Sequence, residues 1–223
     1  MKKLTLFLAL GFGVLCAQEN KAKWGLLVSP EIKHRLLNFV PSKDFRANEN
    51  PGLGVSLGLV SVKNILPKIE FEYGVLFVNK GYRFQFDAVF GDQIDPINGI
   101  IGNPQKVTIK YNYNYLTTPV KLNCYVDEDY FISFGLQPEV LLSANRKTVF
   151  PDSKSRTKIG NIKPVNTSFL LSAGKVFHLN KISFRIEPTL QFGLVNIHKR
   201  TVLVGKESEY LFNVGLGTKW FLN

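Results

Sequence analysis

Cysteine is nearly absent from this chain, which has Cys16 and Cys124 among its 223 residues. Long apolar runs are also scarce, because no stretch after residue 17 reaches the roughly 18 uninterrupted apolar residues that a transmembrane helix requires. Apolar residues at helical spacing are rare throughout. These absences exclude a disulfide framework and a membrane-spanning helix, but they leave open a barrel that crosses a membrane with strands.

The N-terminus has the three parts of a secretory signal. Met1-Lys2-Lys3 carries charge, residues 4–15 are apolar but too few to span a bilayer, and a small residue follows at Ala17. Cys16 raises a lipoprotein alternative. Lipidation is disfavoured because Leu15 is bulky where such a signal has Gly, Ala or Ser.

The sequence thus divides into a signal peptide at 1–17 and a single domain at 18–223. Cys124 is then left without an intrachain disulfide partner, although export usually permits disulfides. Basic residues outnumber acidic ones by 28 to 17, for a formal net charge of +11. An exported chain does not meet nucleic acid, so we expect no nucleic-acid partner despite this charge.

Alternation of apolar and polar residues dominates the remaining sequence and predicts β-strands. The stretch 182–194 is the clearest, with seven apolar side chains alternating with residues such as Arg185, Glu187 and Gln191. Eight such segments are expected: 24–29, 53–60, 69–78, 106–126, one from 130, 165–177, 182–194 and 210–222.

The connections between these segments alternate between short and long. Short ones fall near 62–67, 127–129 and 178–181, and long ones near 33–51, 88–105, 145–164 and 197–208. Outer-membrane barrels have this layout, with short periplasmic turns, long extracellular loops and an even number of strands. The sequence therefore predicts an all-β fold: an eight-stranded antiparallel up-and-down transmembrane β-barrel.

Charged residues occur on the polar face of several predicted strands. An eight-stranded barrel is narrow enough for side chains to fill it, so we expect this face to point inward and the apolar face to meet lipid. A soluble barrel that binds a ligand in the periplasm is the opposite arrangement. We interpret the inward charges as a salt-bridged plug rather than an ion path or proton relay; they are Glu70, Glu72, Lys121, Glu139, Arg185, Glu187 and Lys219.

In two segments the apolar residues change from odd-numbered to even-numbered positions, which we call a switch of parity. The apolar parity switches between 107–115 and 118–124, and again between Phe77 and Tyr82. Each switch indicates either a β-bulge or a hairpin whose upper part rises above the bilayer. Prolines 138 and 188 lie on the apolar parity, and we expect local bulges to absorb them because proline cannot donate to the ladder.

Aromatic residues cluster where a membrane interface is expected. Trp24 and Trp220 lie near the ends of the first and last segments, which would close side by side at the periplasmic end. Tyr111, Tyr113 and Tyr115 are candidates for the opposite aromatic girdle.

One hairpin resembles a known family. It consists of 115–122 (YLTTPVKL), a short acidic turn and 131–138 (FISFGLQP). It is similar to the centre of the PorT-like outer-membrane β-barrel proteins of Bacteroidetes-type bacteria, where a Tyr-Leu-x-x-Pro strand precedes a turn and a Gly-containing strand. The resemblance implies an eight-stranded outer-membrane barrel, and members include a component of a secretion and gliding apparatus. The chain departs from the common outer-membrane ending, an aromatic last residue, because it ends at Asn223.

No motif for catalysis, cofactor or metal binding is evident. His34, His178 and His198 show no spacing typical of a triad or a metal site, although Ser42, Thr201 and Ser208 lie in or near the same loops. We therefore expect a non-enzyme without a cofactor. A lipid-modifying outer-membrane enzyme remains the alternative.

The connection 145–164 is strongly basic. With Asp152 as its one acid, it is either a solvated loop or a surface for an anionic partner. Candidate partners are outer-membrane lipid and lipopolysaccharide, surface glycans, and acidic proteins of the envelope or secretion machinery. The basic residues are Arg146, Lys147, Lys154, Arg156, Lys158 and Lys163.

Overall fold

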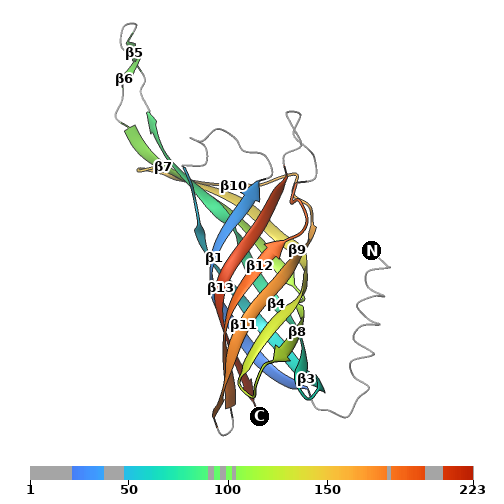
Figure 1. Cartoon of the computed structure of the whole chain (residues 1–223). Helices are drawn as coiled ribbons and strands as arrows, with labels where there is room; N and C mark the ends of the chain where they lie inside the picture. Colours follow the sequence, from blue (N-terminus) through green and yellow to red (C-terminus); the bar gives the residue numbers. More distant parts are fainter. Residues whose placement is uncertain are drawn as a thin grey trace.

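A computed structural model of the chain describes residues 22–37, 48–89, 93–95, 99–101, 104–179, 182–198 and 208–222. The predicted signal peptide at 1–17 lies outside these residues, as do Ser42 and Thr201. Figure 1 shows tilted strands wound into a cylinder, with a group of strands projecting beyond one end. In the described part of the chain, the structure has no helix with the length and hydropathy needed to cross a bilayer.

Eight strand positions close into a ring, as the sequence predicts. Strand β1 pairs with β13 on one side and with β3 on the other, so the ends of the chain close the barrel. Every pairing in the ring is antiparallel. In order around the ring, the strands are β1 (Lys23–Leu37), β3 (Gly52–Leu66), β4 (Ile69–Val89), β7 (Pro104–Thr117) with β8 (Val120–Tyr125), β9 (Tyr130–Val149), β11 (Val165–Leu179), β12 (Ile182–Gly193) and β13 (Glu209–Leu222).

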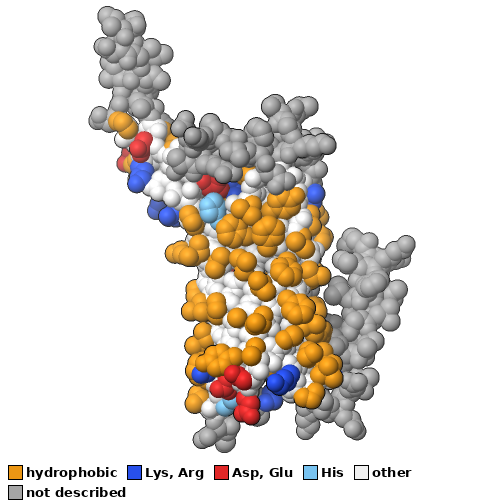
Figure 2. Space-filling view, viewed as in Figure 1, with side chains coloured by type: hydrophobic (Ala, Val, Ile, Leu, Met, Phe, Trp, Pro, Cys, Tyr) orange, Lys and Arg blue, Asp and Glu red, His pale blue; other side chains and the backbone are white. Residues whose placement is uncertain are grey.

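Most apolar side chains of the cylinder face outward and most polar ones face inward, although an apolar cluster around Val60, Leu76 and Phe221 is also buried inside. In β12, Ile182 and Leu190 are exposed, whereas Arg185, Glu187 and Gln191 are buried. Figure 2 shows hydrophobic side chains covering the visible face of the cylinder, with charged side chains toward its two ends. This orientation suits hydrocarbon outside and a polar interior, so it rules out the soluble barrel with an apolar core.

The prolines interrupt the ladder without shifting its register. Pro188 continues the pairing of β12 with β13, and the β11–β12 pairing resumes in the same register beyond it. Pro138 likewise keeps β9 in register with β11. The expectation that bulges absorb these two prolines is therefore wrong. The missing donor leaves a gap on one side of the strand, and neighbouring pairs hold the alignment.

The predicted fourth strand is divided in two. Thr118 and Pro119 separate β7 from β8, and the Thr118 N–H donates to the carbonyl of Pro138 on β9. Both pieces pair with β4 in one continuous register, from Ile69 opposite Cys124 to Val89 opposite Pro104.

The apparent parity switches are therefore not bulges between β4 and β7. The same parity faces inward along the whole of β4, but its side chains change from charged, at Glu70, Glu72 and Lys80, to aromatic, at Tyr82 and Phe84. The bulges lie elsewhere in the described chain. One is in β9 opposite the Asn114–Tyr115 step of β7, and another is in β3 between residues 64 and 66.

Of the two explanations for the parity switch, the projecting hairpin is correct. The pairing of β3 with β4 ends at Val78, and that of β11 with β9 ends at Val140, whereas β4, β7 and β9 stay paired beyond these points. Two further strands extend this projection, which we call the rim sheet. Its strand order is β2 (Glu49–Asn50), upper β4, upper β7, upper β9 and β10 (Lys154–Lys158).

Two sequence predictions about this end are wrong. The stretch 145–164 is largely a β-hairpin rather than a loop, because β9 continues to Val149 and β10 pairs back onto it. Tyr113 and Tyr115 do not form an outer girdle, because both are buried inside the barrel, and Tyr111 packs against the same interior cluster. A small hairpin at the tip of the β4–β7 connection consists of β5 (Gln93–Asp95) and β6 (Gly99–Ile101).

Candidate functional site

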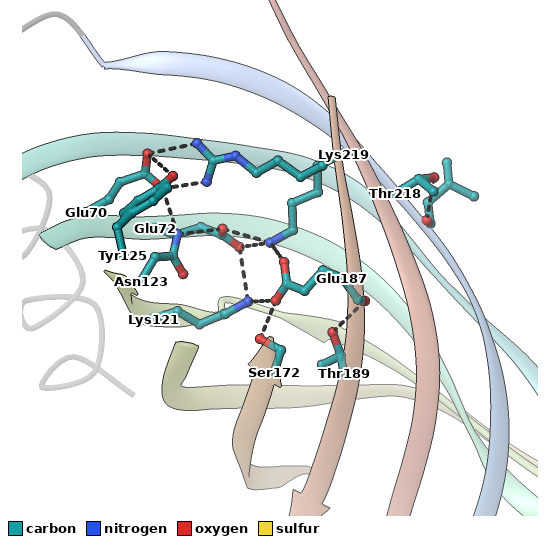
Figure 3. Close-up of polar contacts among 12 residues, drawn as sticks. Glu70, Glu72, Lys121, Asn123, Tyr125, Ser172, Glu187, Thr189, Thr218 and Lys219 are labelled. Atoms are coloured by element: carbon teal, nitrogen blue, oxygen red, sulfur yellow. Dashed lines mark hydrogen bonds and ion pairs between the residues drawn. The ribbon is translucent and has the colours of Figure 1, made fainter. Parts of the chain in front are cut away.

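The half of the lumen nearest the short turns is crossed by a network of ion pairs (Figure 3). Glu187 of β12 is fully buried and contacts Lys121 of β8 and Lys219 of β13. Lys219 also donates to both oxygens of Glu72 on β4, at 2.6 and 2.7 Å. Ser172 adds a further hydrogen bond to Glu187. Strands on opposite sides of the cylinder are thereby tied through its centre.

A second part of this network lies nearer the short turns. Arg185 forms two parallel hydrogen bonds to Glu70, at 2.5 and 2.8 Å, a bidentate geometry that is strong for this pair. Asn123 donates to Glu70 at 2.7 Å and to Glu72 at 3.3 Å, linking the two parts. Three cations and three carboxylates therefore face one another, so the network is formally neutral and its buried charges are matched.

Glu139 is held by a different group of residues farther along the lumen. Lys80 of β4 donates to Glu139 at 2.5 Å and to Ser168 at 2.7 Å, and Asn166 donates to the other carboxylate oxygen at 3.0 Å. The seven predicted lumen residues are thus all buried, but the structure divides them: six meet in one network, and Glu139 lies in a separate cluster with Lys80.

The half of the lumen nearest the rim sheet is filled by aromatic and aliphatic side chains. Tyr82 stacks on Tyr111 with ring centroids 4.6 Å apart, and Phe84 meets Tyr82 edge to face at 5.7 Å. The Arg35 guanidinium lies 4.0 Å from the centre of the Tyr82 ring and binds Glu49 at 2.6 Å and Glu209 at 2.9 Å. This end is therefore closed by ring packing around one neutralised arginine.

A cavity opens at the turn end, below the ion-pair network. Its volume is about 560 Å³, and its lining includes Arg185, Glu70 and Tyr125 with residues of the short turns. Between the network and the aromatic half, a void of about 30 Å³ is lined by Glu31, Gln137 and Lys121, among others. The wider space is thus at the end, and the middle of the lumen is packed.

The predicted basic residues do not gather at one place. Four of them occupy outward-facing positions of β9 and β10 in the rim sheet: Lys147, Lys154, Arg156 and Lys158. Arg146 occupies a position of the opposite parity. Lys163 lies after β10, where its N–H donates to the carbonyl of Ile197. Beside the first group, Arg83 of β4 and Lys110 of β7 complete a basic face.

The histidines do not form a triad or metal site in the described chain. His198 contacts Glu209 at 3.1 Å, His34 lies 3.5 Å from Glu49, and His178 is at the opposite end beside Asp129. No group of three His, Cys, Asp or Glu within the described ranges is arranged to hold a metal ion.

Sequence comparison decides the family. Residues 16–199 match the family described as outer membrane protein beta-barrel domain. The chain belongs to this family. Membership of this family places the protein in the outer membrane, and it agrees with the closed ring of strands and the apolar outer surface. No curated protein matches the sequence.

Solved outer-membrane barrels have similar but distant structures. Neisserial surface protein A aligns at a TM-score of 0.43 with 4% identity, over 89% of this chain and 97% of that one. The protease OmpT of Escherichia coli aligns at 0.38 with 9% identity, over 90% and 96%. Ail of Yersinia pestis, solved with the heparin analogue sucrose octasulfate, aligns at 0.34 with 10% identity, over 91% and 99%. Likenesses this distant do not indicate what the present barrel binds.

Sequence reasoning missed several charged residues in the lumen of this outer-membrane barrel. Glu31, Lys33 and Arg35 share the inward parity of β1 with Leu27 and are all buried. Extending the alternation of the first strand beyond residue 29 would have found them. Lys80 lies within the parity switch between Phe77 and Tyr82, where the sequence leaves a bulge and a projecting hairpin both open and therefore does not fix which positions face inward.

Proposed function

We propose that this protein is a non-enzymatic interaction barrel, exported by its signal peptide, that docks another envelope component through its rim sheet. In this proposal the transmembrane cylinder is a rigid, closed support. The PorT-like resemblance favours a component of a secretion or gliding apparatus as the context. The observation that carries the proposal is the contrast between a lumen filled by matched charges and rings and an outward basic face on the projecting strands.

The first test concerns the closed lumen. The folded chain, inserted into a planar lipid bilayer, is expected to give no conductance steps, because ion pairs and aromatic rings bridge the lumen at successive heights. Simultaneous replacement of Glu72, Lys121, Glu187 and Lys219 by serine should keep the lumen neutral and widen its charged half, and it should not open a channel while the aromatic half remains packed. Steady conductance by the wild-type barrel would contradict the closed-support proposal.

The second test concerns the rim sheet as the docking surface. A photo-cross-linking side chain at Thr108, which is partly exposed on the outward parity of β7 beside Lys110, should form adducts with a neighbour in intact outer membranes. Arg156→Glu should abolish these adducts without unfolding the barrel, because it replaces a positive charge of the basic face with a negative one. Arg146→Glu, on the same hairpin but with the opposite parity, is the matched control and should leave them unchanged. Equal adduct yields in both variants would refute docking through this face.

The third test addresses the enzyme alternative. His34 and His198 contact glutamates, and the described residues bring no serine or cysteine nucleophile to either ring in the hydrogen bonds that the structure forms. We therefore expect lipid A from cells with and without the intact gene to have identical mass spectra. A mass difference that disappears in a His198→Ala variant would favour a lipid-modifying enzyme instead.

A further inference from the structure

Four cations lie in register across the outward face of the rim sheet. Arg83 of β4 is opposite Lys110 of β7, Lys110 is opposite Lys147 of β9, and Lys147 is opposite Arg156 of β10. All four side chains are exposed. Since neighbouring strands are about 4.8 Å apart, the row extends over about 14 Å.

This row has like charges on directly opposite positions. Such pairs destabilise a sheet unless an anion lies between them. Among the described residues, none of the four forms an ion pair with an acid. On the same face of β4, Asp87 lies two rows farther along the strand, where it is opposite Lys106 of β7. The face thus presents a line of positive charge that the described part of the chain does not neutralise.

The residues below the row change in a regular order along each strand. On β7, outward Leu116 is followed by Asn114, Asn112 and then Lys110. On β4, outward Phe77 is followed by Asn79 and, beyond Gly81, by Arg83. The order from apolar to amide to cationic follows the order of a membrane surface, from hydrocarbon through the interface to charged headgroups.

The amide row also forms part of a hollow beside the cations. A cavity of about 350 Å³ is lined by Asn79, Asn112, Asn114 and Asn145 together with Lys147, Lys154, Ser155 and Arg156. From the barrel side, Lys33 donates to the side chains of Asn79 at 2.5 Å and Asn112 at 2.8 Å. These contacts fix two of the amides that face the hollow and bring a further cation, Lys33, close to it.

The direction of this face identifies the source of the anion. Figure 1 shows the β4–β7 projection leaning away from the cylinder, and Figure 2 shows Lys and Arg side chains on its flank, above the hydrophobic band. A face with this tilt looks onto the surrounding leaflet rather than into the lumen. The long-loop end of an outer-membrane barrel meets the outer leaflet, whose lipid carries phosphate groups on sugars.

We propose that the outward face of the rim sheet binds the phosphate groups of lipopolysaccharide in the leaflet beside the barrel. The inference rests on the proposed docking role of this sheet and names its partner. The in-register row of Arg83, Lys110, Lys147 and Arg156 contacts the phosphates, and the asparagines beneath it donate hydrogen bonds to the sugar and phosphate oxygens. Arginine and lysine both suit this ligand, arginine through its planar fork of donors.

The test measures binding of lipopolysaccharide to the folded chain in detergent micelles by microscale thermophoresis. The same preparation, dephosphorylated with aqueous hydrofluoric acid, and inorganic phosphate serve as the other probes. The triple variant Lys110→Gln, Lys147→Gln, Arg156→Gln is compared with a control that also loses three positive charges, Lys68→Gln, Arg146→Gln, Lys175→Gln. The first three residues belong to the row. Of the control residues, Lys68 and Lys175 lie at the end of the barrel with the short turns, and Arg146 lies on the rim sheet at a position of the opposite parity.

We expect the row variant to bind lipopolysaccharide at least tenfold more weakly than wild type, and the control to stay within twofold. Dephosphorylation should weaken wild-type binding by a similar factor. Inorganic phosphate at matched concentration should not displace the lipid. Binding by the row variant within twofold of wild type, equal binding of the dephosphorylated lipid, or full displacement by inorganic phosphate would each overturn the inference.

The cross-linking at Thr108 separates this inference from the proposed function. If Arg156→Glu abolishes protein adducts there while the row variant binds lipopolysaccharide normally, the sheet docks a protein and the lipid assignment fails alone. If neither measurement responds to the substitutions, both the docking role and the lipid assignment fail.

Discussion

The two halves of the lumen are filled in opposite ways. Near the short turns, Glu72, Lys121, Glu187 and Lys219 fill the space with matched charges, whereas near the rim sheet Tyr82, Tyr113 and Tyr115 fill it with rings. Both solutions occlude a narrow cylinder. They differ in what each residue depends on, since a buried charge needs its partner and a buried ring needs its neighbours in contact.

This difference follows the surroundings of each half. Beside the bilayer the outer face is apolar, so polar side chains can be accommodated only inside. Above it, the rim sheet has a polar outer face, as in an ordinary soluble sheet, and its apolar side turns inward. The chain therefore exchanges the chemistry of its two faces at about Gly81 without changing its register.

The largest effect is expected from breaking the charged half. Glu187→Gln should destabilise the barrel by about 4 kcal/mol, because Lys121 and Lys219 lose a buried partner. The measurement is urea unfolding of the barrel in lipid vesicles. Combining it with Lys121→Met should restore part of the loss, because the uncompensated cation is removed. A double variant less stable than Glu187→Gln would contradict the matched-charge account.

A somewhat smaller effect is expected from a cavity in the aromatic half. Tyr113 is buried in the ring cluster, and Tyr113→Ala should cost about 3 kcal/mol in the same unfolding measurement. Tyr113→Phe, which keeps the ring, should cost less than about 1 kcal/mol. Equal losses in the two variants would show that the hydroxyl rather than ring packing holds this half together.

The boundary between the halves is tested at Gly81. Its φ of +144° is unfavourable for other residues, and a Cβ there would lie 2.0 Å from the Tyr111 carbonyl oxygen. Gly81→Ala should therefore cost about 2 kcal/mol and loosen the rim sheet, seen as faster amide hydrogen exchange in upper β4 and β7. Gly160→Ala is the control, since a Cβ there has no neighbour within 4 Å in the described structure. Unchanged exchange in Gly81→Ala would argue against a strained boundary.

The smallest effect is expected at the exposed turn between β8 and β9, outside both halves. The N–H groups of Tyr130 and Asp129 donate to the Asp127 carboxylate at 2.7 and 2.8 Å and hold its pKa below the ordinary value of 3.8. A lowered pKa means that the stabilisation is complete above the ordinary pKa and is lost as the pH falls through the lowered one. The difference in urea midpoint between wild type and Asp127→Ala should thus be constant near neutral pH and shrink in acid. A difference that persists at the lowest accessible pH would refute this assignment.

Strand alternation predicts the membrane part of the fold well. In β12, the unbroken outward row and the inward Arg185 and Glu187 follow directly from the pattern, because lipid on one side imposes a strict rule. The same rule identifies the buried charges, but it does not state which of them pair. Glu139 lies with Lys80, far along the lumen from the other six, because strand stagger sets heights that a single sequence does not reveal.

The rim sheet differs from the sequence predictions for the complementary reason. The sequence predicts Tyr113 and Tyr115 in an outer girdle because tyrosine favours the membrane–water interface, but this part of the chain lies above the bilayer and its rings turn inward. The sequence predicts a loop in place of the hairpin at 145–158 because the two strands carry lysine and arginine in place of apolar residues, so the alternation is hidden. Its cation row depends on pairing among four strands, and a single sequence does not show such an alignment.

The seam between β1 and β13 has a consequence for how the molecule is made. Gly25 lies opposite Phe221, so the wall is incomplete until the last segment of the chain has arrived. Every shorter intermediate has two open edges whose amides would be unsatisfied in hydrocarbon. Biogenesis must therefore deliver the whole polypeptide before the bilayer can receive it, and truncation near the C-terminus should abolish insertion rather than yield a smaller cylinder.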